Sequence, residues 1–194
     1  MIKKTLFLLL LGCSLMFSQS LGDIPRGFFL SFGVGPRVPV FSFSEKSVVG
    51  IGGSIEISYT DIDVLPVFLY GRIGFDQFYG SQEFYQTSDH THYSENYVPI
   101  TAGAKYFFAP ISPNSLIMPF AEVSASLVVY QEFHDFKASS GRNNYLSDGL
   151  TYGFSAGGGV SMFLMELLAS FNVYHDHTFF SADLKVRIPL YVAF

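Results

Sequence analysis

Lys185-Val-Arg-Ile-Pro-Leu-Tyr-Val-Ala-Phe194, the last ten residues of the sequence, decide the fold class. Apolar residues occupy every second position from Val186 to Phe194, and the cations Lys185 and Arg187 lie between them. Because successive side chains of a β-strand point to opposite faces, this pattern predicts a strand with one apolar face. The opposite face carries both cations, so the strand needs an apolar environment on one side only.

The composition is unusual for a water-soluble protein. Charged residues make up 14% of the 194 residues and aromatic residues 18%, whereas ordinary globular proteins are about 25% charged. The longest uncharged stretch beyond the N-terminal segment, 149–165, carries five glycines and is a poor candidate for a spanning helix. A chain this apolar has one other way to cross a bilayer, which is a closed barrel.

The period-two pattern recurs along the chain in segments of about ten residues, as transmembrane barrel strands require. We therefore predict an all-β fold, an eight-stranded antiparallel up-and-down transmembrane β-barrel. The segments are 28–35, 49–59, 67–76, 98–106, 122–129, 150–162, 167–173 and 180–194.

Two alternatives remain open at this point. A soluble barrel or sandwich would show the same period with its apolar face inward. The polar face favours the membrane barrel, because it is mostly Gly, Ser and Thr, which fit a narrow lumen, rather than the Lys and Glu of a wet surface. The stretch 162–171 is also compatible with a short helix.

Charged side chains on the predicted inner face are nearly balanced. Buried charges are tolerated when they are paired, so these side chains predict an ion-pair network that fills the lumen. A polar pathway for ions or small solutes is the alternative. The nine residues are Arg37, Arg72, Lys105, Lys185 and Arg187 with Glu56, Asp76, Glu122 and Asp183.

All five histidines fall in or beside three predicted connections at one end of the barrel, the long 80–96 and 132–148 and the short 175–178. His90 with His92, and His175 with His177, have the His-x-His spacing that puts both rings on one face of an extended segment. With neighbouring Asp residues they are weak candidates for a zinc site. Polar residues also simply collect in wet loops, and we predict neither a metal nor a cofactor.

The N-terminal residues are typical of an export signal. A basic start with Lys3 and Lys4 precedes the apolar run 5–17, and Ser18 and Ser20 suit a cleavage site. We expect residues 1–20 to be a signal peptide and 21–194 to form the barrel domain. Leu10-Leu-Gly-Cys13 is similar to a bacterial lipobox, so lipidation of Cys13 is the alternative.

The phased strands, the unequal connections and the terminal Phe194 resemble the small outer-membrane β-barrels of the porin-like/OmpA-like superfamily of Gram-negative bacteria. The resemblance implies a location in the cell outer membrane, with both chain termini on the periplasmic side. It also implies that Phe194 is part of the signal read by the barrel assembly machinery.

The resemblance leaves function open, because members of this superfamily serve adhesion, membrane integrity, solute passage or lipid modification. We predict a non-enzymatic protein, structural or surface-binding through its extracellular loops. Its expected partners are outer-membrane lipids, the assembly machinery and an extracellular ligand. The formal charge of −5 excludes a basic surface for nucleic acid.

The alternatives are a narrow gated channel and a lipid-modifying enzyme similar to lipid A deacylases. The enzyme would need a Ser–His–acid unit near the outer rim. His175, His177, Ser181 and Asp183 are near one another in sequence. The deacylase pattern of His-x-Ser followed by Asn is absent, since Thr178 follows His177.

The terminal residue provides the first testable prediction. Replacing Phe194 by Ser should lower the amount of folded barrel in the outer membrane while export to the periplasm continues, because the assembly signal is lost. Phe163→Ser, in the predicted turn between two strands, is the control. Fractionation and immunoblotting measure both pools, and unchanged assembly of the Phe194 variant would contradict the prediction.

Overall fold

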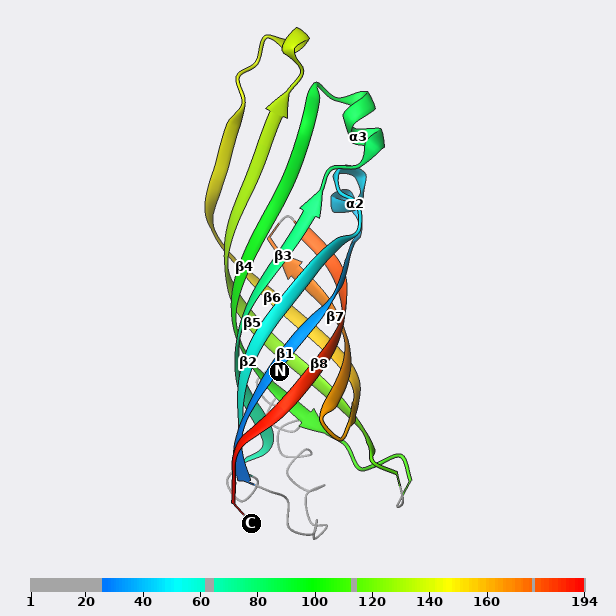
Figure 1. The fold of residues 1–194 in the computed structure, drawn as a ribbon, viewed down its shortest axis with the longest axis vertical. Coiled ribbons are helices and arrows are strands. Elements are labelled where there is room, and N and C mark those ends of the chain that lie inside the picture. Colours follow the sequence, from blue (N-terminus) through cyan, green and yellow to red (C-terminus); the bar gives the residue numbers. More distant parts are fainter. Residues whose placement is uncertain (1–25, 62–64, 113–114, 176, 194) are drawn as a thin grey trace, which may run out of the picture.

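A computed structural model describes residues 26–61, 65–112, 115–175 and 177–193. Within these residues eight antiparallel strands form one closed sheet, in which each strand pairs with its neighbours in sequence and β8 pairs with β1 (Figure 1). The predicted fold class is confirmed. The strands are β1 (Arg26–Pro39), β2 (Gly50–Asp61), β3 (Leu65–Tyr79), β4 (His90–Phe107), β5 (Ile117–Phe136), β6 (Tyr145–Met162), β7 (Met165–Tyr174) and β8 (His177–Ala193).

The outer face of the sheet is an apolar belt. Ile73, Val123 and Leu150, which lie on three different strands, are 59, 61 and 61% exposed. Many inward-facing side chains of the strands are small or charged and buried, as Ser126 and Arg37 illustrate. This arrangement is the reverse of a soluble barrel and suits contact with lipid.

The two ends of the barrel differ. Arg26 pairs with Ala193, so the start of β1 and the end of β8 lie side by side at one end, which we call the short-turn end. The other, long-loop end carries the helices α2 (Ser42–Lys46), α3 (Gln82–Thr87) and η1 (Ala138–Ser140). No helix in the described part of the chain is long and apolar enough to cross a membrane.

Three strands are longer than the sequence pattern indicates. Parts of the predicted connections 80–96 and 132–148 are strand, because β4 begins at His90, β5 runs to Phe136 and β6 begins at Tyr145. In Figure 1 these strands rise well above the remaining barrel at its upper, long-loop end. The stretch 162–171 forms a turn and strand β7 rather than a helix.

The alternation in the final segment is interrupted by a β-bulge. Phe28 pairs with Tyr191 and Phe29 with Pro189, so Leu190 is the extra residue. Pro189 has no N–H to donate to the ladder, which favours an irregularity here. The predicted inward position of Tyr191 is therefore wrong, and its side chain is 64% exposed beside Phe28 on the outer face.

Closure of the sheet predicts resistance to unfolding in detergent. Each strand is hydrogen-bonded to two neighbours in the closed sheet, so the folded barrel should migrate faster than the boiled chain on a detergent gel. Gly35→Trp provides a comparison, because a side chain there would collide with the backbone of β8 at Ala182 and open the β1–β8 seam. A single band that is independent of boiling in the unsubstituted protein would contradict a closed barrel.

Candidate functional site

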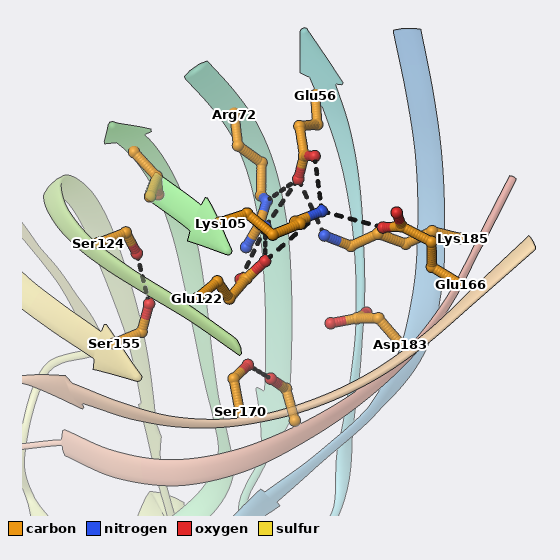
Figure 2. Close-up of polar contacts among 12 residues, drawn as sticks. Glu56, Arg72, Lys105, Glu122, Ser124, Ser155, Glu166, Ser170, Asp183 and Lys185 are labelled. Atoms are coloured by element: carbon orange, nitrogen blue, oxygen red, sulfur yellow. Dashed lines mark hydrogen bonds and ion pairs between the residues drawn. The ribbon is translucent and has the colours of Figure 1, made fainter. Parts of the chain in front are cut away.

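The Glu56 carboxylate is the centre of the lumen. It is fully buried on β2 and accepts hydrogen bonds from Arg72 Nη2 at 2.7 Å, Lys105 Nζ at 3.1 Å and Lys185 Nζ at 2.9 Å. These cations come from β3, β4 and β8, so one carboxylate joins four strands (Figure 2). Alternation within each strand turns all four side chains inward.

Two further carboxylates share the same cations. Arg72 Nη2 lies 2.9 Å from Glu122 Oε1, and Lys105 Nζ lies 2.9 Å from Glu166 Oε2. Glu166 also pairs with Arg187. We call this set the central network. Its members are Glu56, Arg72, Lys105, Glu122, Glu166, Lys185 and Arg187.

A second ion-pair set lies closer to the long-loop end. Arg37 Nε donates to Asp76 Oδ1 at 2.6 Å, and Arg37 Nη1 donates to Asp183 Oδ1 at 2.9 Å. The pair packs against the backbone of Gly52, where a Cβ would collide with both Arg37 and Asp76. Glycine at this position therefore permits the close approach.

The nine charged residues selected from the sequence all lie in these two sets. Sequence reasoning missed Glu166, because it placed a turn at 164–165 and began the strand at 167. The signal was present, since Glu166 has the same parity as Ser170 and Asn172 on the inner face of β7. Within the described lumen, Glu166 brings the two sets to five cations and five anions.

Aromatic layers lie on both sides of the charges. Toward the short-turn end, the Arg187 guanidinium carbon is 5.6, 5.4 and 5.0 Å from the ring centres of Phe29, Phe68 and Phe107. Toward the long-loop end lies a buried aromatic cluster that the sequence pattern did not indicate. Its members are Phe43, Phe78, Tyr97, Val128, Tyr174 and Phe179.

Phe43 shows why this cluster was missed. It belongs to α2, a connection rather than a strand, and its ring packs edge-on against Phe78 at 4.8 Å. Below the cluster, hydroxyl pairs such as Ser170–Ser181 at 2.7 Å and Thr101–Ser126 at 2.8 Å satisfy the small inner side chains. The cavity beside them is about 30 Å³, which is room for about one water molecule.

A separate cluster lies above the aromatic layer, beyond the apolar belt. Glu95 is fully buried on β4 and accepts hydrogen bonds from the Tyr93 and Tyr97 hydroxyls. Its Oε2 is 3.4 Å from His177 Nε2, and Glu132 is its partner in the β4–β5 register. We call Glu95, Glu132 and His177 the rim cluster.

A cavity of about 390 Å³ opens beside the rim cluster. Glu132 and His177 contribute to its wall, together with Tyr97, Tyr130 and His175. Sequence reasoning placed Glu95 and Glu132 in or beside loops. If the alternation is followed further along β4 and β5, it places both Glu95 and Glu132 on the inner face.

The predicted His-x-His pairs do not behave alike. A bulge at Thr91 puts His90 opposite Phe136 and His92 opposite Asp135, so the expectation that both rings share a face is wrong. His90 Nε2 lies 3.2 Å from His134 Nδ1, while His92 is exposed. Burial and the neighbouring His134 lower the pKa of His90. His175 and His177 do share the wall of the rim cavity.

The residues considered for a Ser–His–acid unit are separated in space. His177 and Ser181 are four residues apart on one strand, so their Cα atoms are about 13 Å apart. The buried Phe179 ring occupies the inner face between them. Ser181 bonds to Ser170 and Asn172, and Asp183 bonds to Arg37.

Three expectations concern residues outside the described part of the chain. They are the signal peptide at 1–20, the lipobox at Cys13 and the assembly signal at Phe194.

Comparisons with known proteins show the fold. No protein-family model matches the chain, and no curated protein matches it either. Among solved structures, Neisserial surface protein A is similar, with 14% identity, a TM-score of 0.50 and coverage of 86% of this chain and 99% of that one. Ail of Yersinia pestis, solved with the heparin analogue sucrose octasulfate, has 12% identity, a TM-score of 0.53 and coverage of 85 and 100%. The chain has the fold of the small eight-stranded outer-membrane β-barrels.

Proposed function

We propose that the protein is a non-enzymatic integral barrel of the outer membrane whose lumen is closed and whose long-loop end faces the outside of the cell. The observation that carries this proposal is the layering of the lumen. The central network lies between two aromatic layers, and its charges are paired across the barrel. An eight-stranded interior is about wide enough to be filled by side chains.

The charge balance supports a structural role for these side chains. A conducting pore keeps its charged groups hydrated, whereas Glu56, Lys105 and Lys185 are fully buried and both lysines donate hydrogen bonds to Glu56. Charges that are this well paired and desolvated hold strands together.

The outer end supports surface binding. β4, β5 and β6 extend beyond the apolar belt, and Phe133, Tyr145 and Leu146 are exposed on this extension. Exposed aromatic side chains are common in binding surfaces. Ail was solved with the heparin analogue sucrose octasulfate, and the long-loop end of the present chain carries both acidic and basic side chains, among them Glu132, Lys137 and Arg142. We propose an extracellular ligand, lipid contacts along the belt, and insertion by the barrel assembly machinery.

Enzyme activity is disfavoured by the separation of His177 from Ser181 described above. A gated channel is the competing function, and the experiments below distinguish it from a closed barrel.

The closed lumen predicts an absence of steady conductance. Purified folded protein in planar bilayers should give no stable single-channel currents, because aromatic and ion-paired layers block the path. Phe78→Ala combined with Phe179→Ala removes two rings of the upper layer and provides the comparison. Large, ion-selective currents from the unsubstituted protein would refute the proposal and favour the channel.

The ion pairs predict a specific loss of stability. Arg72→Met removes the closest ion-pair partner of Glu122 and one of three cations around Glu56. Breaking one side of a buried pair typically costs about 3–5 kcal/mol. Denaturant unfolding in detergent should show this loss.

Arg142→Met, on the exposed connection before β6, is the matched control and should change stability by less than about 1 kcal/mol. In a hydrated pathway the charges are already solvated. Equal unfolding midpoints for Arg72→Met and the unsubstituted protein would therefore contradict the structural role.

A further inference from the structure

Three side chains with metal-ligand chemistry converge at the long-loop end. Glu95 comes from β4, Glu132 from β5 and His177 from the start of β8, and one ligand atom from each lies within 4.8 Å of the others. The Glu95–Glu132 pair is fixed by the β4–β5 register. His177 reaches them across the mouth of the barrel, with its ring packed edge-on against Phe43 at 4.7 Å.

We propose that the rim cluster binds a divalent transition metal of the zinc type. Zinc takes imidazole nitrogen and carboxylate oxygen at about 2.0–2.2 Å, so two ligands of a tetrahedral ion are about 3.3–3.6 Å apart. His177 Nε2 and Glu95 Oε2 are already 3.4 Å apart. Glu132 is half-buried at the cavity wall and needs only a side-chain adjustment to complete the set.

The carboxylates of the rim cluster and those of the central network have different partners. In the central network every carboxylate is bonded to Lys or Arg. At the rim, within the described residues, the ion-pair partners recorded for Glu95 and Glu132 are His177 and His134. Glu95 and Glu132 face each other across β4 and β5, and like charges at such positions destabilise a sheet. A bound dication would remove this repulsion.

The surroundings hold the ligands in place. His134 Nε2 lies 3.3 Å from Glu132 Oε2, and the Tyr93 and Tyr97 hydroxyls donate to Glu95. Hydrogen bonds of this kind orient metal ligands and typically contribute to affinity. The cavity of about 390 Å³ gives access from outside and room for a water molecule as fourth ligand.

The ligand set also selects against other cations. Calcium takes six to eight oxygen ligands, and magnesium prefers near-ideal octahedral oxygen coordination. The rim cluster offers two carboxylates and an imidazole, which suit zinc and its transition-metal neighbours. The proposal does not depend on the closed lumen, because the aromatic cluster separates the two regions.

Zinc titration of the folded, chelator-treated barrel in detergent tests the proposal. Calorimetry should give one Zn²⁺ per chain. His177→Gln and Glu132→Gln should each weaken zinc binding by more than about a hundredfold, since each removes a ligand. His134→Gln should weaken it by roughly 10- to 100-fold, the usual effect of removing a group that orients a ligand. Calcium at the same concentrations should give no comparable heat.

His92→Gln is the matched control, because His92 is exposed on the opposite face of β4 and should leave zinc affinity unchanged. Each variant is first checked for the faster gel migration of the folded barrel. If only His177→Gln folds, its zinc affinity alone decides whether the rim cluster binds the metal. A raised unfolding midpoint in zinc, lost in that variant, would support the site independently. No binding by the unsubstituted protein, or equal binding by folded His177→Gln, would overturn the proposal.

Discussion

The pairing of β1 with β8 is the interaction on which the rest of the structure depends. Hydrocarbon offers no water to unpaired N–H and C=O groups, so a sheet in a bilayer must close on itself. The seam runs from Arg26–Ala193 to Pro39–Phe179 and tolerates the bulge at Leu190 without losing closure. Closing with eight strands makes the interior narrow, and that narrowness sets the chemistry of every inward position.

Narrowness explains why charges and glycines coexist in the lumen. Side chains from opposite walls meet, as when Lys185 of β8 and Arg72 of β3 both reach Glu56. Such contacts need bare backbone nearby, which Gly52 provides under the Arg37–Asp76 pair. Some of the ion pairs, such as Lys105–Glu166 between β4 and β7, therefore join strands that share no hydrogen bonds and link them across the lumen.

Period-two alternation predicts the fold and the facing of residues such as Arg72, because it reports a two-sided environment directly. The alternation gives a wrong prediction where a bulge interrupts it, and it misses residues where a strand continues beyond its predicted end. The bulge at Leu190 reversed the expected side of Tyr191. Glu166 was missed because a turn was predicted next to it. Glu95 was missed because the first part of β4 was predicted to be a loop. Phe43 could not be found this way, since a helix carries it into the barrel.

The carboxylates of the central network and those of the rim cluster have different partners. We relate this difference to a structural role for the first set and to exchange of a bound cation at the second. Arg72, Lys105 and Lys185 all donate hydrogen bonds to Glu56, so this carboxylate has no unmet demand for a further cation. Neutral imidazole is a common metal ligand in proteins. The contact of Glu95 with His177, in place of Lys or Arg, is the reason for the metal site proposed at the rim. The aromatic cluster lies between these regions, so exchange at the rim need not disturb the ion pairs that hold the barrel together.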